Sequence, residues 1–496
     1  MASLFAKKPL NTILSEAQET GEHSLKRALG VLNLVTLGIG AIIGAGIFVI
    51  TGQAAAQFAG PAIIISFVMA GVACALAGLC YSEFASMIPI AGSAYTYSYA
   101  TLGELIAWII GWDLILEYAF GAATVAVGWS GHLRAFVHDL GWSMGAMPTS
   151  NFTLFGHAVQ LKYDYIGFLI IALITTILVI GIKESANFTT IIVFLKVAVV
   201  CVFIALATAF LSNHHWQPNH WHPFIPPNTG ERGMFGWSGI LRGAGVVFFA
   251  YIGFDAVSTA AQEARNPKRD MPIGILLSLV ICTILYIAVS GLLTRIVPYT
   301  QLNVPDPVVI GMRATGHQWA TILVEIGALL GLATVMLVML LGQSRVFYSM
   351  SKDGLLWPWA SKIHPRFRTP YLTSIVVGFF VAILATLIPL SVLDEMTSVG
   401  TLLAFVLVSA GVWVMRRSHP DVPRPFKTPM VPLIPILSIL ASGTLIVSLS
   451  YWTQLRLVAW LIIGLVIYFT YGRKHSKVQR VRGSVSESKP TPTMAD

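Results

Sequence analysis

The sequence carries little charge for its length. Only 11% of its 496 residues are Asp, Glu, Lys or Arg, whereas a soluble domain carries about 25%. Hydrophobic residues make up 56% of the chain, and its mean hydropathy is +0.76. This composition excludes an ordinary soluble domain and indicates a polytopic membrane protein.

Cysteine is also scarce. The four cysteines, Cys74, Cys80, Cys201 and Cys282, all lie in apolar runs. They have no metal-ligand spacing and suggest no disulfide framework, so we expect them to pack between helices. The loop from 212 to 236 contains four histidines but no cysteine, and no carboxylate before Glu231. We therefore predict no metal site, no cofactor and no catalytic residue, and we interpret this loop as a polar extracellular segment.

We expect no cleavable signal peptide, because the first thirty or so residues are polar and charged and the first apolar run is too long for one. Long hydrophobic runs are abundant instead. About twelve are long enough to cross a bilayer as helices. The predicted spans are 29–56, 61–87, 101–129, 164–182, 188–212, 238–262, 272–297, 318–345, 372–390, 394–415, 432–451 and 454–472.

The positive charges are segregated by loop. If the N-terminus is cytoplasmic, cytoplasmic segments hold 23 Lys and Arg residues and the opposite side holds 7, with Lys196 inside a span. Lys and Arg concentrate on the cytoplasmic side of membrane proteins, so we predict that both termini are cytoplasmic. The net charge of +9 therefore reflects membrane topology, and we expect the chain to bind lipid bilayer and no nucleic acid.

The first span has an unusual centre. Residues 38–48 read GIGAIIGAGIF, with Gly40, Gly44 and Gly46 at mid-bilayer depth. Glycine permits non-helical backbone, which survives in a bilayer only when it is buried in protein or lines a wet cavity. We interpret this stretch as a broken helix whose free N–H groups at 44–46 face an anion. The alternative is that the glycines only allow close helix packing.

The sixth span is interrupted in a similar way. Residues 248–255 read FFAYIGFD, and Gly253 would open the break. The two interrupted spans are five apart, and an odd repeat unit must insert its second copy upside down. We therefore predict an all-α membrane protein with a 5+5 inverted repeat. Its parts are an N-terminal tail (1–28), a first five-helix repeat (29–212), an extracellular loop (213–237), a second repeat (238–415), helices 11 and 12 (432–472) and a disordered tail (473–496).

Lys196 is the most conspicuous charge within a span. It lies about nine residues inside the fifth span, or about 13 Å deep. Ionisable residues inside the membrane are costly and mark functional sites by default, and a buried ammonium readily loses its proton. Lys196 is therefore a candidate proton carrier, or a fixed positive charge in place of a bound cation. It could also cap the carbonyl groups at the break in helix 1.

Four of the carboxylates within predicted spans are also candidates for function. Asp255 follows the helix 6 break and either takes part in proton movement or caps the second half-helix. Asp113 and Glu117 lie four residues apart on one helix face. Glu117, with Tyr118, either lines the substrate pocket or is a structural carboxylate that forms hydrogen bonds between helices. Glu325 is interpreted as an interfacial or packing carboxylate.

These features suit an α-amino acid, which has one anionic and one cationic end. The N–H groups of Gly44, Ala45 and Gly46 would bind its carboxylate. The carbonyl groups of Ile42, Phe249, Ala250 and Ile252 would bind its ammonium group. Its side chain would then point towards spans 3 and 8.

The chain resembles the amino acid–polyamine–organocation (APC) transporters, especially bacterial relatives of the cationic amino acid transporters, from about residue 25 to residue 471. Besides the two broken-helix motifs, the resemblance rests on EARNPKRDMPIG (263–274) and SRVFYSMSKDG (344–354). It implies a LeuT-type fold in the bacterial plasma membrane, alternating access, and amino acid uptake coupled to protons. It places Lys196 at the helix 5 lysine of the family, and Phe249, Ile252 and Asp255 in the site. A small membrane subunit or a bound lipid as partner is left open.

The sequence departs from the family pattern at two site positions. Met336 matches a pocket-lining position, where it would fill the space that a long cationic side chain needs. Ala45 stands where relatives often have a hydroxyl residue. We therefore expect small or branched neutral amino acids at least as much as cationic ones.

Three other functions compete with the symporter. An exchanger or polyamine transporter would use the same fold, and a transporter-fold sensor would bind without transport. A membrane-embedded enzyme would need a nucleophile or metal cluster at one depth, and the in-membrane cysteines show no histidine or metal partner in the sequence pattern.

Overall fold

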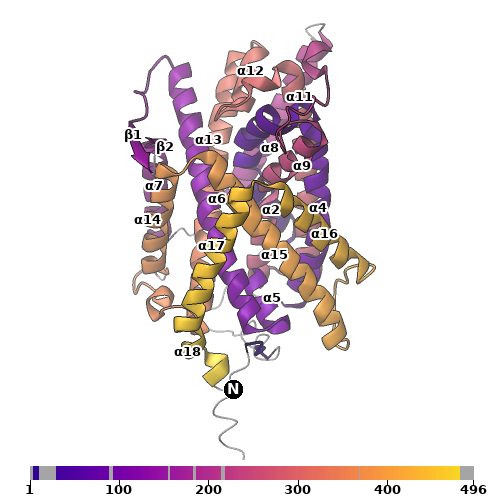
Figure 1. Cartoon of the computed structure of the whole chain (residues 1–496), viewed down its shortest axis with the longest axis vertical. Coiled ribbons are helices and arrows are strands. Elements are labelled where there is room, and N and C mark those ends of the chain that lie inside the picture. The colour runs from indigo at the N-terminus through magenta and orange to yellow at the C-terminus, as the bar shows by residue number, and fades with distance from the viewer. Residues whose placement is uncertain are drawn as a thin grey trace, which may run out of the picture.

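The computed structural model describes residues 4–9, 29–88, 93–154, 157–181, 186–213, 218–367 and 369–480. These residues form an elongated helical bundle. The N-terminal end and the last helix, α18, lie at one end of the bundle, and α12 lies at the other (Figure 1). Most of the predicted N-terminal tail, 10–28, and residues 481–496 lie outside the described residues.

The first half of the chain contains the first predicted repeat. Its elements are α2 (Val31–Ile42), η1 (Gly46–Ile50), α3 (Thr51–Ala54), η2 (Ala55–Ala59), η3 (Gly60–Ala62), α4 (Ile63–Met87), α5 (Ser93–Thr101), α6 (Glu104–Asp139), β1 (Thr149–Leu154), β2 (His157–Lys162), α7 (Tyr165–Ile180), α8 (Ala186–Ser212) and η4 (Pro218–Trp221).

The second half continues with the remaining predicted spans. Its elements are α9 (Gly236–Val247), η5 (Phe248–Tyr251), α10 (Phe254–Thr259), η6 (Ala261–Glu263), α11 (Pro267–Ile296), η7 (Tyr299–Gln301), α12 (Pro307–Ala314), α13 (Gln318–Lys352), η8 (Pro358–Ser361), α14 (Tyr371–Leu387), α15 (Leu390–Ser418), α16 (Leu433–Ser448), α17 (Tyr451–Ile467), η9 (Tyr468–Gly472) and α18 (Arg473–His475).

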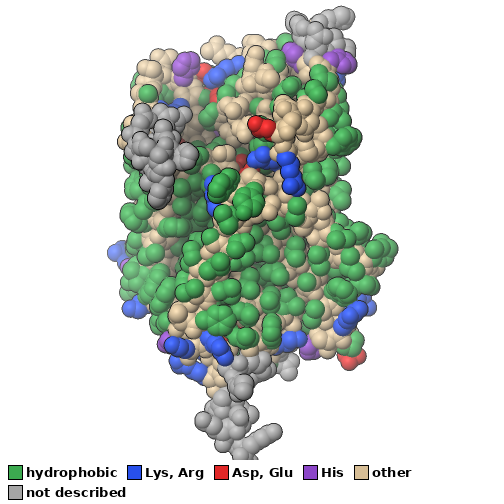
Figure 2. Space-filling view, viewed as in Figure 1, with side chains coloured by type: hydrophobic (Ala, Val, Ile, Leu, Met, Phe, Trp, Pro, Cys, Tyr) green, Lys and Arg blue, Asp and Glu red, His purple; other side chains and the backbone are tan. Residues whose placement is uncertain are grey.

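Several of these helices are suited to a bilayer. Within the described part of the chain, seven are long and apolar enough to span a membrane, and the 57-residue run Val31–Met87 counts as one of them although it contains the breaks between α2 and α4. Three shorter apolar helices are α7, α14 and α16. On the face in Figure 2, hydrophobic side chains cover the middle of the bundle and Lys and Arg gather near the end that holds the N-terminus. The protein is a multi-pass membrane protein.

Helix α6 is the central support of the bundle. It packs along α13, α15 and α14. Glycines allow this close approach: a Cβ built on Gly121 would lie 2.9 Å from Met339 Sδ of α13, and one built on Gly111 would lie 2.7 Å from Met350 Sδ. A methyl group at either position would therefore displace the flexible methionine side chain that packs against it.

Two short helices and two strands were not predicted from the sequence. The short helices α5 and α12 lie outside the predicted spans, and β1 and β2 pair as an antiparallel hairpin from Thr149↔Lys162 to Leu154↔His157. The prediction of an all-α chain is therefore wrong in this loop. The alternation of the hairpin extends over only six residues per strand, which is too short to stand out beside the long apolar runs.

The C-terminal segment is more ordered than we predicted from residue 473 onward. Residues 473–475 form α18, and residues 477–480 are also helical. Ser476 is fully buried and hydrogen-bonds to Glu104 at the start of α6. Gln479 Nε2 donates to Glu104 Oε1 over 2.7 Å, so this end of the chain is held against α6 by side-chain contacts that composition does not reveal.

Candidate functional site

Helix 1 is broken where the glycine motif predicted. Helix α2 ends at Ile42, and Ile43 has extended backbone with φ −72° and ψ 101°. The helical path resumes only at Gly46 with η1, a π-helix. The N–H groups of Gly44 and Ala45 donate no backbone hydrogen bond to any described residue outside the regular helices. The break therefore leaves donors at the start of a half-helix, where an anion is favoured.

Helix 6 is broken at the matching place. Helix α9 tightens into the 3₁₀ turn η5, Ile252 is extended, and Gly253 has φ +113° before α10 begins. That positive φ disfavours any residue with a Cβ. A Cβ on Gly253 would also lie 2.8 Å from the Ala41 carbonyl carbon, so glycine is required both by the turn and by the close approach of helix 1.

The two breaks lie against each other. A Cβ built on Gly46 would lie only 2.2 Å from Ala250 Cα, and Gly253 contacts Ala41. The backbone of helix 1 at 41–46 thereby meets the backbone of helix 6 at 250–253, which is the region where we predicted that both ends of an amino acid bind. All the substrate-binding residues that we predicted, from helices 1, 3, 6 and 8, are buried.

Lys196 lies at the end of the first half of helix 1. Its Nζ donates to Gly40 O over 2.9 Å and to Ile43 O over 3.4 Å. Its side chain is 1% exposed, and within the described part of the chain it forms no salt bridge. The ammonium group is therefore stabilised by carbonyl groups that the helix break leaves free. This contact matches the capping alternative and is compatible with a proton carrier.

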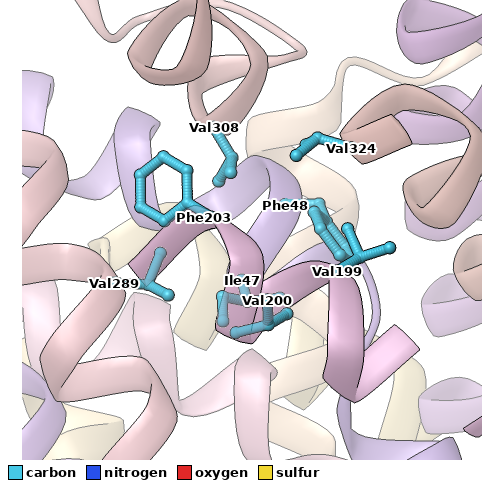
Figure 3. A pocket seen from close by; sticks show the side chains of 8 residues that line it. All are labelled: Ile47, Phe48, Val199, Val200, Phe203, Val289, Val308 and Val324. Carbon is cyan, nitrogen blue, oxygen red and sulfur yellow. The ribbon is translucent and has the colours of Figure 1, made fainter. Parts of the chain in front are cut away.

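An apolar cluster lies on the side of Lys196 nearer α12. It consists of side chains from η1, α8, α11, α12 and α13, shown in Figure 3: Ile47, Phe48, Val199, Val200, Phe203, Val289, Val308 and Val324. The space between them leaves no room for a water molecule. Val199, Val200 and Phe203 follow Lys196 by three, four and seven residues and so continue along its side of α8. We call this set the apolar plug, because it separates Lys196 from the α12 end of the bundle.

Tyr286 of α11 is a site residue that sequence reasoning missed. Its hydroxyl oxygen lies 2.8 Å from Ile42 O and 2.8 Å from Ala250 O. These are two of the carbonyl groups predicted to bind the substrate ammonium. The single hydroxyl proton can satisfy only one of them at a time. No sequence signal marked Tyr286, because it lies in a regular apolar span and only the fold brings it to both breaks.

Helix α13 meets the site through neighbours of the residue that we predicted. Met336 is fully buried, but the side chain against helix 1 is Val335, whose Cγ2 would lie 2.8 Å from a Cβ on Gly44. Met339 contacts the Gly121 position of α6. The side chains that α13 presents to helix 1 and to α6 at these positions are therefore apolar.

Three buried carboxylates lie near the helix 6 break. Tyr118 donates to Asp255 Oδ2 over 2.8 Å. Both oxygens of Asp113 and Oε1 of Glu117 are buried without a hydrogen-bond partner among the described residues. Asp255 is the second residue of α10, a first-turn position at which a carboxylate stabilises a helix N-terminus. An unpartnered buried carboxylate is costly when charged, which marks this group as a place for protons or for a cation.

Other candidates from the sequence lie elsewhere. Glu325 is 0% exposed and pairs with Arg313 over 3.2 Å, consistent with a packing carboxylate. In the histidine-rich loop, His214 and His215 lie outside the described residues, and His220 Nδ1 lies 2.8 Å from Arg295 O. The described residues contain no group of three or more His, Cys, Asp or Glu residues arranged for a metal.

Sequence comparisons agree with this architecture. Residues 29–471 match the model of the amino acid permease family. The chain is 47% identical to the branched-chain amino acid permease of Bacillus subtilis (strain 168), with 96% of this chain and 99% of that protein covered. It is 43% identical to the methylthioribose transporter of the same organism, over 97% of this chain and 100% of that protein.

A more distant relative extends the comparison to plants. The chain is 37% identical to the vacuolar cationic amino acid transporter 4 of Arabidopsis thaliana, over 85% of this chain and 68% of that protein. These matches, together with the paired helix breaks, identify a transporter and not an enzyme. The chain belongs to the amino acid permease family of the APC superfamily.

Proposed function

We propose that this protein is a proton-coupled symporter that imports neutral, branched amino acids across the bacterial plasma membrane. The observation that carries the proposal is the contact of Lys196 with Gly40 O and Ile43 O, because it joins a titratable group to the hinge of the substrate site. The name of the branched-chain permease relative and the apolar Val335 and Met336 on α13 support the substrate class.

The substrate would lie between the two breaks. Its carboxylate would bind the N–H groups of Gly44, Ala45 and Gly46, and its ammonium group would bind the carbonyl groups of Ile42, Ala250 and Ile252. Tyr286 would release those carbonyl groups when the substrate binds. The side chain would point towards Val335 and Met336, with Glu117 and Tyr118 beyond.

Proton coupling follows from the two charge states of Lys196. The ammonium form holds the end of α2 through two carbonyl groups, and the neutral amine holds it less strongly. Loss of the proton would therefore free the first half of helix 1 to move, which is the movement that alternating access needs. Asp255, linked to Tyr118, is the second candidate for proton transfer.

The same proposal covers fold and orientation. A LeuT-type arrangement of two inverted five-helix repeats is supported by breaks five spans apart. Cytoplasmic termini are supported by the bias of 23 against 7 Lys and Arg residues and by the position of α18 beside the N-terminal end (Figure 1).

Uptake by proteoliposomes tests this proposal. We expect an inward proton gradient to stimulate uptake of labelled isoleucine, leucine and valine. Stimulated uptake of arginine or lysine instead would give the main role to Glu117 and contradict the substrate class. Uptake only into vesicles preloaded with amino acid would identify an exchanger, and binding without any uptake would identify a sensor. Methylthioribose belongs in the panel because of the second relative.

A further inference from the structure

Arg313 of α12 lies among three carboxylates from different elements. Its Nη2 lies 2.8 Å from Asp139 Oδ1 at the end of α6 and 3.2 Å from Glu325 Oε1 of α13. Its Nε donates to Asp139 Oδ2 over 3.0 Å, and its Nη1 lies 3.9 Å from Asp306 Oδ2 just before α12. We call these four residues the arginine junction.

The arginine junction has more negative than positive charge. One guanidinium faces three carboxylates. Within the described part of the chain, the other titratable group that pairs with them is His138, whose Nδ1 lies 3.5 Å from Asp139 Oδ1 and whose side chain is 78% exposed. Burial raises the pKa of Asp306 despite the opposing effect of Arg313. The junction as a whole therefore favours the uptake of a proton.

Asp139 and Glu325 are placed to share that proton. Both contact the same nitrogen of Arg313, because Asp139 Oδ1 lies 2.8 Å and Glu325 Oε1 lies 3.2 Å from its Nη2, so the two carboxyl groups are neighbours. Glu325 is fully buried, and its Oε2 has no hydrogen-bond partner among the described residues. Two carboxylates cannot hydrogen-bond to each other, whereas a carboxyl and a carboxylate can. One added proton would give Glu325 Oε2 a hydrogen-bond partner. It would also remove the repulsion between the carboxylate of Asp139 on α6 and that of Glu325 on α13.

The junction controls the position of α12. Val308 of α12 and Val324 of α13 belong to the apolar plug (Figure 3), and Glu325 follows Val324 directly. The segment before α12 is also tightly packed: a Cβ on Gly131 of α6 would lie 2.3 Å from Pro305 Cβ, and one on Gly52 of α3 would lie 2.2 Å from Pro307 Cβ. A change in the junction would therefore move the element that covers η1 and closes this end of the bundle.

We propose that the arginine junction is a second proton-binding site, shared by Asp139 and Glu325, which holds α12 closed over the apolar plug. The proton comes from water on the α12 side and binds one carboxyl oxygen, and no other bond is made or broken. With the proton bound, α6, α12 and α13 are joined through Arg313. Without it, the two adjacent carboxylates repel each other and α12 moves away from the plug more often. This inference goes beyond the proposed function, because it does not depend on Lys196.

The accessibility of the plug to a thiol reagent tests the proposal. Val308→Cys is introduced into the full-length chain with exposed Cys201 replaced by alanine, and its modification rate is divided by that of the exposed variant Trp142→Cys at each pH to correct for thiol ionisation. We expect the corrected rate to fall roughly fivefold or more between about pH 8 and about pH 5.5, since the proton shifts a two-state equilibrium.

Variants of the two carboxylates distinguish this site from other titrating groups. Glu325→Gln and Asp139→Asn supply an amide donor in place of the shared proton, so both should give the low rate at both pH values. Glu231→Gln, which neutralises an exposed carboxylate outside the junction, should keep the wild-type response. The proposal would be overturned if the modification rate still changed with pH in both junction variants. It would also be overturned if the rate did not change with pH when Asp139 and Glu325 are both present. Neither result depends on whether uptake is proton-coupled, so failure of the symporter proposal is recognised separately.

Discussion

Two cations of this protein lie in opposite surroundings. Lys196 is deep in the bundle, and among the described residues its Nζ bonds to two backbone carbonyl groups, Gly40 O and Ile43 O. Arg313 is 37% exposed and is surrounded by carboxylates. Lys196 thus has no counter-ion within the described part of the chain, whereas the charge of Arg313 is over-compensated and fixed.

The difference assigns different tasks to the two cations. A lysine without a counter-ion is a candidate to change charge during a transport cycle, and the carbonyl groups that it contacts, Gly40 O and Ile43 O, lie on either side of Ile42, which we propose binds the substrate. An arginine cannot lose its proton in proteins, so at its site only the carboxylates can titrate. Proton-dependent movement is therefore expected at both ends of the apolar plug, with the lysine titrating at one end and the acids at the other.

The largest effect is expected from removing the charge of Lys196. Lys196→Met should reduce gradient-driven uptake roughly a hundredfold or more, because a coupled cycle needs a group that binds and releases the proton. Lys196→Arg should also lose coupling while it keeps a cation for the carbonyl groups of the break. The measurement is initial uptake in proteoliposomes, with size-exclusion profiles to verify folding. Coupled uptake at the wild-type rate in either variant would show that Lys196 is only a structural cap.

The next effect concerns the contact between the two breaks. Gly46→Ala should lower the free energy of unfolding by about 1–3 kcal/mol and strongly reduce transport, because the added Cβ would meet the backbone of Ala250 at 2.2 Å. Gly443→Ala in α16 is a matched control, since nothing lies within 4 Å of its Cβ position. Thermal unfolding of the purified proteins measures both. Equal stability of the two variants would mean that the breaks are not held together.

A smaller effect is expected at Tyr286. Tyr286→Phe should lower the free energy of unfolding by about 1–3 kcal/mol, because it removes the hydroxyl proton that satisfies one of two buried carbonyl groups, Ile42 O or Ala250 O. The same change should increase the rise in melting temperature that saturating substrate causes, because the Tyr286 hydroxyl no longer competes with the substrate ammonium group for the carbonyl groups.

Tyr468→Phe provides the comparison for Tyr286. It removes a buried hydroxyl that bonds to Glu104 over 2.9 Å, far from the breaks in sequence. It should lower the melting temperature without changing the substrate-induced shift. If Tyr286→Phe behaved in the same way as Tyr468→Phe, Tyr286 would have no part in substrate binding.

The smallest effect is expected from Asp306. The pKa of Asp306 is raised, so the folded state binds more protons than the unfolded state just above the usual carboxyl pKa, and stability falls as the pH rises through this window. Asp306→Asn should remove that loss and raise stability at neutral pH by less than about 1 kcal/mol. Melting temperatures at several pH values measure this. A lower stability of Asp306→Asn at neutral pH would show that Asp306 is a needed partner of Arg313.

Local patterns predicted the breaks but not their partners. GIGAIIGAGIF and FFAYIGFD place glycines at mid-span, and a helix interrupted there must be buried against protein. The tertiary contacts Gly46–Ala250 and Gly253–Ala41 join residues about two hundred positions apart, which no periodicity records. For the same reason Tyr286 and Val335 were missed, although Met336, the neighbour of Val335, was selected.

The membrane class, the broken helices 1 and 6 and the buried lysine were determined by the sequence alone, because hydrophobic length, mid-span glycine and intramembrane charge each have a local physical cost. What Lys196 bonds to, which hydroxyl lies between the two breaks and which carboxylates surround Arg313 were decided only by the tertiary structure. These contacts depend on how helices distant in the chain pack side by side, and small residues such as Gly40 and Gly46 permit that packing without specifying its partner.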